Sequence, residues 1–361
     1  YPCHVESLAE MAAVGGNVFD TPQPEGMELA DTFVPIKSIL QVLTERLAPA
    51  TKLHYAQGCG ILDPAEADFG AAITAARSAE VAVVVVGDRA GLTAPCTTGE
   101  ARDRAELGLP GVQQQLIQAL QATGTPLVVV LVNGRPAAIP WIDEHVPAIV
   151  EAWLPSEEGA EAVADVLLGD YNPGGKLAIT VPRGVGQVPI YYAHKASGGR
   201  SQWKIEYVEM SNQPLYPFGH GLSYTSFTLD NLRCDHDEVR AGEPITLSLD
   251  VTNTGAVAGD EVVQLYIRVP SASVTRPVKE LKGFQRLHLE AGERRCVRFV
   301  LPVNACAYLD ETMQLVIEPG VLELMIGTSS AETPLRKTVQ IAGATAKVQR
   351  KGAFFSQAEV I

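Results

Sequence analysis

Short, continuous apolar runs mark the first half of the chain, and runs of this length predict strands that are buried on both faces of a sheet. The clearest runs cover residues 81–87 and 127–133, which are mostly valine and leucine. Three shorter runs, at 52–56, 148–152 and 177–181, predict further strands of the same sheet.

Between these strands, apolar residues recur at helical spacing, which predicts helices over residues 32–47, 68–79, 110–122 and 157–168. Pro110 is expected in the first turn of the third helix, where a residue needs no N–H donor. Strands that alternate with helices of this length are typical of a parallel sheet with helices on both faces. We therefore predict an α/β fold for residues 1–222, with a mainly parallel sheet sandwiched by helices.

The pattern changes in the second half, where apolar and polar residues alternate strictly over residues 245–251 and 263–269. Further short strands are predicted at 297–301 and 321–326. Short alternating strands separated by turn residues are typical of an antiparallel β-sandwich. We assign this all-β sandwich to residues 223–345 and treat residues 346–361 as a tail.

Composition narrows the class of ligand. Hydrophobic residues make up 46% and charged residues 19% of the 361 residues, which is typical of a globular protein. The net charge of −14 comes with no basic stripe that would neutralise nucleic-acid phosphates, and the longest apolar runs are too short to span a bilayer. We therefore expect neither a nucleic acid nor a membrane as partner, and the charge suits a neutral ligand such as a sugar.

The six cysteines form no CxxC pair, and no metal-binding cluster is visible, which argues against a metal site. Cys59 and Cys96 are candidates for a disulfide that would pin the loop around Cys96, although sequence does not establish the required geometry. If the thiols stay reduced instead, a cytoplasmic location is favoured.

A candidate catalytic residue follows the strand at 81–87. It is Glu100, whose carboxyl group belongs to a glycine-rich loop. In open α/β sheets, ligands bind at the loops that follow the carboxyl ends of strands. The order of glycines in this loop does not match G-x-G-x-x-G, so a nucleotide-binding domain is a weaker alternative and no cofactor is expected.

Several segments resemble the carboxyl-terminal part of the family 3 glycoside hydrolases, which include β-glucosidases and β-xylosidases. The segments that carry the resemblance of the α/β domain cover residues 81–115, 151–182 and 216–225. Residues 247–255, 259–266 and 281–284 resemble the fibronectin type III-like module that ends these enzymes. Together these segments span nearly the whole chain.

The resemblance implies a retaining exo-acting β-glycosidase that removes a terminal β-linked sugar. Glucose is the first candidate for this sugar and xylose is the second. Glu100, in Gly99-Glu100, would be the general acid/base. The family's nucleophilic aspartate lies on an amino-terminal barrel, which these 361 residues do not include, so a companion chain or domain is expected. The family's first strand is also outside the sequence, and we expect the companion to fill that gap in the sheet. A homo-oligomer is left open.

A general acid must begin protonated, and a neighbouring nucleophilic carboxylate raises the pKa of such a group. We therefore expect Glu100 to titrate as an ordinary glutamate until the barrel lies beside it. The alternative for Glu100 is a surface glutamate that pairs with Arg102 or Arg104. We expect Arg102, Asp103 and Arg104 to brace the loop.

Three residues are candidates for the wall of a sugar subsite, namely Arg89, Arg200 and Trp203. Sugars bind by stacking on an aromatic face and by hydrogen bonds to their hydroxyls, which suits this set. The alternative is that these residues belong to surface loops. A second hypothesis for the whole chain is a catalytically inactive fragment that binds carbohydrate or serves as a scaffold.

Overall fold

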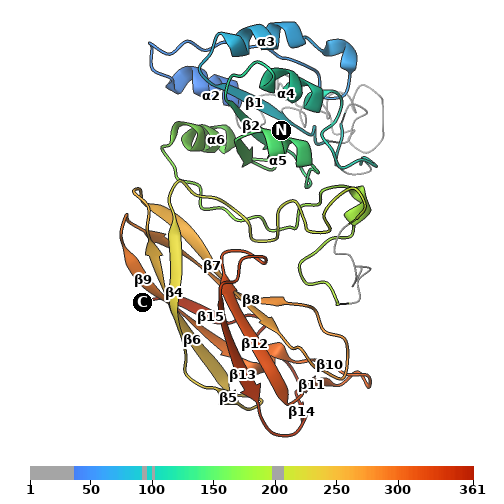
Figure 1. Ribbon diagram of the computed structural model, residues 1–361, viewed down its shortest axis with the longest axis vertical. Helices are drawn as coiled ribbons and strands as arrows, with labels where there is room; N and C mark the ends of the chain where they lie inside the picture. Colours follow the sequence, from blue (N-terminus) through green and yellow to red (C-terminus); the bar gives the residue numbers. More distant parts are fainter. Residues whose placement is uncertain (1–35, 92–95, 100–101, 197–206) are drawn as a thin grey trace, which may run out of the picture. The chain divides into compact units, whose positions relative to one another are not determined.

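The computed structural model describes residues 36–91, 96–99, 102–196 and 207–361 (Figure 1). The chain forms two compact units, one of residues 1–171 and 182–186, and one of residues 172–181 and 187–361. The predicted domain boundary between residues 222 and 223 stays a prediction. Within the described ranges, no helix has both the length and the apolar character needed to cross a membrane.

The first unit contains a parallel sheet in the order β1 (Ala82–Gly87), β2 (Leu127–Val132) and β3 (Ala148–Glu151). Val84 of β1 pairs with Val129 of β2, which in turn pairs with Ile149 of β3. Because consecutive strands are parallel, their carboxyl ends meet at one edge of the sheet. The predicted α/β class with a mainly parallel sheet is confirmed.

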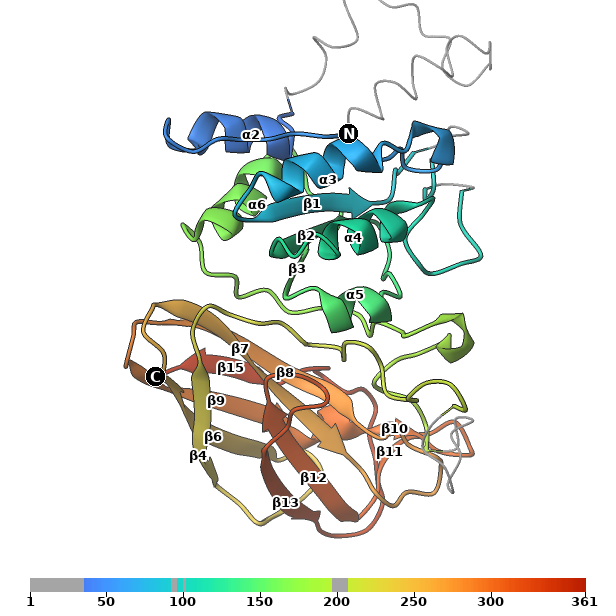
Figure 2. The same cartoon turned by 45° about the horizontal axis from the view of Figure 1, so that its top comes forward.

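Two groups of helices flank this sheet on opposite faces (Figure 2). The described helices of the unit are α2 (Ile39–Arg46), α3 (Phe69–Arg77), α4 (Gln113–Gln121), α5 (Pro140–His145) and α6 (Gly159–Leu168), with a 3₁₀ turn η2 (Pro64–Glu66) before α3. A second described 3₁₀ turn, η3 (Val185–Gln187), has residues of both units. Helix α2 packs against α6 on one face, whereas α4 contacts both α3 and α5 on the other.

Local capping sets the start of the first described helix. The Ser38 hydroxyl accepts a hydrogen bond from the N–H of Gln41, whose side chain accepts one from the N–H of Ser38. This capping box satisfies two helix-terminal donors and begins the helix at Ile39, later than the predicted start at residue 32. Helix α4 likewise begins at Gln113, so Pro110 lies before the helix and the expectation for its first turn is wrong.

Two predicted strands, 52–56 and 177–181, are absent from the described sheet. Leu53 and Tyr55 are exposed and no described strand pairs with them, so the segment 52–56 has no ladder to join. In the second run, Val181 forms a single bridge with Tyr216. Leu177 also bonds through its backbone to Gly219 and His220, so this segment has a hydrogen-bonded neighbour but forms no regular ladder with it.

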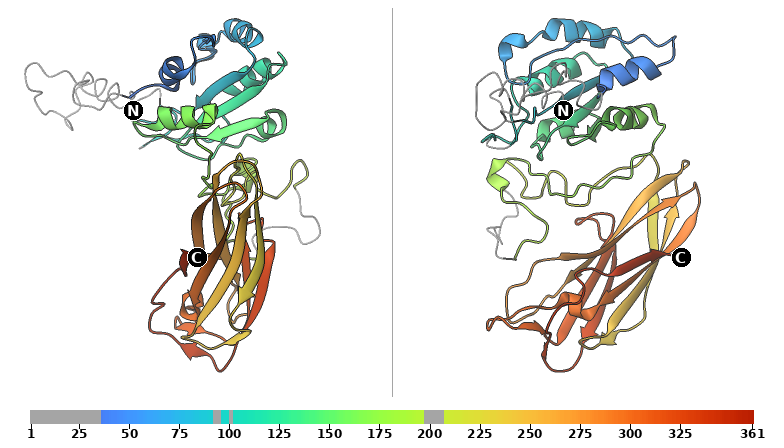
Figure 3. Two further views of the ribbon diagram at one scale, coloured as in Figure 1. Left: turned by 90° about the vertical axis from the view of Figure 1, so that its left-hand side faces the viewer. Right: turned by 180° about the vertical axis from the view of Figure 1, so that it is seen from behind.

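The second unit is a β-sandwich, seen from two sides in Figure 3. One sheet has the order β15-β9-β6-β4, the other β5-β13-β12-β7-β8, and a small third sheet has the order β10-β11-β14. The strands are β4 (Phe227–Cys234), β5 (Glu238–Val239), β6 (Pro244–Asn253), β7 (Gly259–Arg268), β8 (Glu280–Leu289), β9 (Arg294–Pro302), β10 (Tyr308–Leu309), β11 (Leu315–Ile317), β12 (Gly320–Gly327), β13 (Leu335–Ile341), β14 (Ala346–Lys347) and β15 (Gln357–Val360). A 3₁₀ turn η4 (Val303–Cys306) follows β9.

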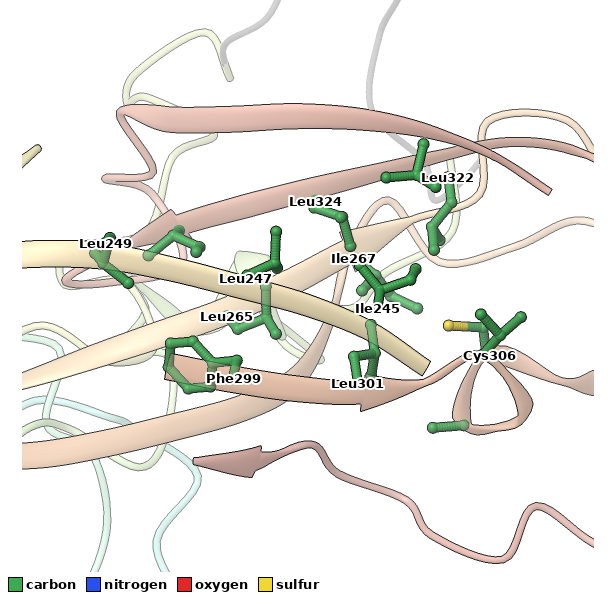
Figure 4. Packing of buried hydrophobic residues seen from close by; sticks show 14 of the residues in the cluster. Ile245, Leu247, Leu249, Leu265, Ile267, Phe299, Leu301, Cys306, Leu322 and Leu324 are labelled. Carbon is green, nitrogen blue, oxygen red and sulfur yellow. The ribbon is translucent and has the colours of Figure 1, made fainter. Parts of the chain in front are cut away.

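The sandwich core consists of the inward-facing residues of both sheets (Figure 4). Leu247 and Leu249 of β6, Leu265 of β7, Phe299 of β9 and Leu324 of β12 are all fully buried. Their alternation with less buried positions along β6 is the two-residue period of a half-buried strand. The tail also contributes to this unit, because β15 pairs with β9 and β14 pairs with β11.

Candidate active site

The end of β1 is fixed by a hydrogen-bonded glutamine. The Gly87 N–H donates to Oε1 of Gln113 at 2.7 Å, and Nε2 of Gln113 donates to the Gly87 carbonyl at 2.9 Å. Gly87 has φ +144°, and a Cβ there would lie 1.9 Å from the Val132 carbonyl oxygen, so the position requires glycine. These contacts fix the direction in which the chain leaves the strand at Asp88.

Loop 88–104, which follows β1, has two described arms that are bonded to each other. The N–H of Thr97 donates to the Arg89 carbonyl at 2.8 Å, and the N–H of Gly91 donates to the Thr98 carbonyl at 3.0 Å. The Thr97 hydroxyl donates to Oδ1 of Asp88 at 2.8 Å and accepts from the Arg89 N–H at 3.0 Å. Residues 88–91 and 96–99 therefore form a narrow, braced stem at the carboxyl edge of the sheet.

The stem continues directly into the sequence around Glu100, which lies outside the described residues. Gly99 has φ +135° and approaches Gly91 so closely that a Cβ would meet the Gly91 carbonyl oxygen at 2.3 Å. The N–H of Arg102 donates to the Gly99 carbonyl at 3.2 Å, and its guanidinium donates to the Cys96 carbonyl at 3.4 Å. Both described neighbours of Glu100 in the chain are thus held by hydrogen bonds.

The predicted bracing residues contact the segment that leaves the loop. Arg104 donates from Nη1 to the Gly108 carbonyl at 2.8 Å, and its N–H donates to the Asp103 side chain at 2.7 Å. These contacts suit the bracing role expected for Arg102, Asp103 and Arg104, a role that stays a prediction. Arg89 lies in the stem at the carboxyl edge, whereas Arg200 and Trp203 lie outside the described residues.

Arg135, a residue that sequence reasoning missed, reaches the loop from the end of β2. Its guanidinium donates to Oδ1 of Asp103 and to the Arg104 carbonyl, the latter at 3.3 Å, and its Nε lies 3.8 Å from Oδ2 of Asp88. The sequence contained an indication of this residue, because Arg135 follows the predicted strand at 127–133. The loops after neighbouring parallel strands lie at the same edge of the sheet.

A half-buried carboxyl group, Glu151, lies at the carboxyl end of β3. The N–H of Trp153, a residue with φ +53°, donates to Oε1 of Glu151 at 3.1 Å. Burial raises the pKa of Glu151 to about 7, although the hydrogen bonds from Trp153 and from the Asn133 side chain act in the opposite direction. Sequence analysis missed this acid because an isolated glutamate in an apolar stretch carries no distinctive pattern.

A hollow of about 200 Å³ lies beside the second half of β1. Its wall includes Val85, Val86 and Asp88 of β1 and its loop, and Gln57 and Cys59 of the segment that precedes α3. The described structure does not join Cys59 to Cys96 by a disulfide. The parts of the chain that the structure describes hold no cluster of three potential metal ligands.

A parallel sheet with a braced polar loop at its carboxyl edge, followed by a β-sandwich, defines a two-part architecture in which the α/β part carries the candidate site. Residues 6–224 match the glycosyl hydrolase family 3 C-terminal domain, and residues 261–330 match the fibronectin type III-like domain. The chain therefore belongs to glycosyl hydrolase family 3, in agreement with the resemblance seen in the sequence.

Curated relatives and solved structures agree on this family. The chain is 38% identical to a β-xylosidase of Formosa agariphila over 94% of its own length and 47% of that protein. It is 38% identical to a periplasmic β-glucosidase of Salmonella typhimurium, over 81% of the chain and 41% of that protein. The crystal structure of a Listeria innocua β-glucosidase in complex with glucose superposes with a TM-score of 0.72 at 33% identity, covering 80% of the chain and 40% of that structure. The chain thus spans less than half the length of these relatives.

Proposed function

We propose that this chain is the carboxyl-terminal part of a retaining exo-β-glycosidase that hydrolyses terminal β-linked glucose, with xylose as the second candidate sugar. Glu100 is the general acid/base in this proposal, and the nucleophilic aspartate comes from the family's barrel. The observation that carries the proposal is the loop itself. It leaves the carboxyl edge of a parallel sheet, and hydrogen bonds fix Gly99 and Arg102 on either side of Glu100.

The chemistry needs one carboxyl group that changes protonation state. In the first step the nucleophilic carboxylate attacks the anomeric carbon while Glu100 gives its proton to the leaving oxygen, so the aglycone departs as an alcohol. In the second step the Glu100 carboxylate takes a proton from water, whose oxygen attacks the anomeric carbon and releases the sugar. The two carboxyl groups of retaining enzymes lie about 5 to 5.5 Å apart, so the barrel must approach this loop closely.

The open edge of the sheet supports a companion segment. Among the described strands, β1 pairs with β2 alone, and Val83 and Val85 are 38% and 47% exposed. An exposed apolar edge strand is normally covered, because its unpaired backbone groups recruit other strands. We propose that the part of the enzyme carrying the barrel also supplies a strand against β1.

The test is hydrolysis of nitrophenyl β-glucoside and β-xyloside by the native enzyme preparation, with wild type compared with Glu100→Ala. Loss of a general acid/base is expected to lower kcat by about 10²–10⁴-fold. Azide should restore part of the turnover of Glu100→Ala and give a glycosyl azide of retained configuration, because azide attacks the glycosyl-enzyme without a general base.

The control is Glu144→Ala, which removes an exposed glutamate from α5 of the same unit and should leave both activities unchanged. Wild-type protein that turns over neither substrate would contradict the proposal and favour the non-catalytic, carbohydrate-binding alternative. Full activity in Glu100→Ala would contradict the assignment of the acid/base.

A further inference from the structure

Arg135 contacts both ends of loop 88–104. Its side chain is 17% exposed, and its Nε lies 3.8 Å from Oδ2 of Asp88, the first residue of the loop, whose side chain is 6% exposed. At the other end, Nη1 of Arg135 donates to Oδ1 of Asp103 and to the Arg104 carbonyl. The guanidinium therefore links the entry and the exit of the loop to the residues that follow β2.

This link has a physical basis in burial and geometry. A carboxylate as buried as that of Asp88 needs a cation or hydrogen-bond donors near it, and it has Arg135 together with the Thr97 hydroxyl. A guanidinium is planar, always charged and carries five donors in a fixed arrangement, so one group serves partners on two segments at once. A lysine ammonium at the same position would be a point charge without this planar arrangement of donors.

The arginines of the loop itself act differently. The contacts described for Arg102 and Arg104 are with carbonyls of residues 96, 108 and 109, which are close to them in sequence. Arg135 is instead about 30 residues from its loop partners and belongs to the next strand–loop connection of the sheet. Its contacts therefore connect the loop to the residues that follow β2, whereas the contacts given for Arg102 and Arg104 connect segments that are adjacent in sequence.

We propose that Arg135 is a positioning residue for the general acid/base. It fixes both ends of loop 88–104 and thereby the place of the proton donor within it. The proposal rests on the proposed function, since Glu100 lies in the chain between the two held ends. Proton transfer requires heavy atoms within about 2.6–3.2 Å, so a loop that shifts by an ångström loses much of this catalysis.

The first experiment measures loop order and needs no activity. Amide hydrogen exchange is compared in the native enzyme for wild type, Arg135→Met and Arg135→Lys. We expect exchange in the described arms, residues 88–91, 96–99 and 102–104, to rise at least about tenfold in Arg135→Met and by less in Arg135→Lys, while β2 is unchanged. The matched control is Arg46→Met, since Arg46 also bridges several carboxylates, those of Glu161, Asp165 and Asp170, and its side chain is only 25% exposed.

The second experiment separates positioning from general loss of structure. Kinetics are compared for a 2,4-dinitrophenyl glycoside, whose leaving group needs no proton, and a phenyl glycoside, whose leaving group does. In Arg135→Met we expect kcat/KM for the phenyl glycoside to fall at least about tenfold more than that for the dinitrophenyl glycoside. Arg135→Lys should lie between wild type and Arg135→Met, and Arg46→Met should keep the wild-type ratio.

The outcomes are distinguishable. Unchanged exchange in the loop arms of Arg135→Met overturns the proposal, and so does an equal fall for both substrates, which is the mark of a purely structural role. If wild type lacks glycosidase activity or Glu100→Ala keeps it, the proposed function fails. The exchange experiment then decides by itself whether Arg135 holds the loop.

Discussion

The main-chain N–H of Trp153 donates a hydrogen bond to the carboxyl group of Glu151, which lies two residues earlier at the end of β3. The bond closes a tight turn in which Trp153 takes a left-handed conformation, with φ +53°. A half-buried acid thus accepts a hydrogen bond from a local backbone donor, in a place where burial raises its pKa to about 7. Burial outweighs this hydrogen bond, which by itself lowers the pKa, and so makes the first unit sensitive to pH.

We predict that Glu151 lowers stability as the pH rises. Below its ordinary pKa of 4.5 the group is protonated in both the folded and the unfolded chain. Between 4.5 and about 7 the unfolded chain releases the proton and the folded chain keeps it, so the free energy of unfolding falls over this window. Glu151→Gln, which stays neutral, should unfold like wild type at pH 4 and be more stable by about 2–3 kcal/mol at pH 8.

The measurement is denaturant unfolding of the first unit at both pH values. Glu80→Gln, which removes an exposed carboxyl group from the same unit, is the control and should leave the wild-type difference between the two pH values in place. If the stability of Glu151→Gln depends on pH in the same way as that of wild type, Glu151 is not the group that causes this dependence.

Gln113 is predicted to be essential for the geometry at the end of β1. Its side chain, 3% exposed, pairs with both the N–H and the carbonyl of Gly87. Gln113→Ala leaves these two buried groups without partners and should lower the free energy of unfolding by about 2–4 kcal/mol. Gln121→Ala at the exposed end of the same helix should change it by less than about 0.5 kcal/mol, as measured by denaturant unfolding. Equal effects of the two substitutions would refute this account.

A buried ion pair in the second unit allows a double-mutant test. Nζ of Lys176 lies 2.8 Å from Oε1 of Glu261, and the two side chains are 14% and 8% exposed. Lys176→Met leaves a buried carboxylate without its cation and should cost about 3–5 kcal/mol. Lys176→Met combined with Glu261→Leu should recover most of that loss, because replacing both charges removes the unpaired carboxylate. Additive losses in the cycle would show that the two side chains are not coupled.

The open edge of β1 predicts association when the chain is studied alone. Val85→Lys places a charge on this exposed strand and should reduce self-association in sedimentation velocity experiments at increasing concentration. Val257→Lys is a close control, because Val257 is 47% exposed, as Val85 is, but lies outside the strands of the sandwich. A chain that associates equally with either substitution would place the contact elsewhere.

The spacing of apolar residues predicted most of the helices and strands, because a regular backbone buries its side chains at fixed intervals along the chain. The runs at 81–87 and 127–133 became β1 and β2, and the alternation at 245–251 and 263–269 became β6 and β7. The start of α2 differs from the prediction by several residues, since the capping hydrogen bonds of Ser38 compete with the apolar period. The run at 52–56 has the same composition as a strand but no described neighbour to pair with.

By itself, the sequence determined the two-part architecture, the family and the loop in which the candidate acid/base lies, because apolar period, turn residues and local motifs are written in consecutive residues. The tertiary structure decided that Gln113 fixes Gly87, that Arg135 reaches Asp88 and Asp103, and that burial raises the pKa of Glu151 to about 7. Those properties depend on groups from strand ends, from the residues that follow them and from helix α4, which meet at one edge of the sheet. Their distances and burial arise only when the chain packs, and no local pattern encodes them.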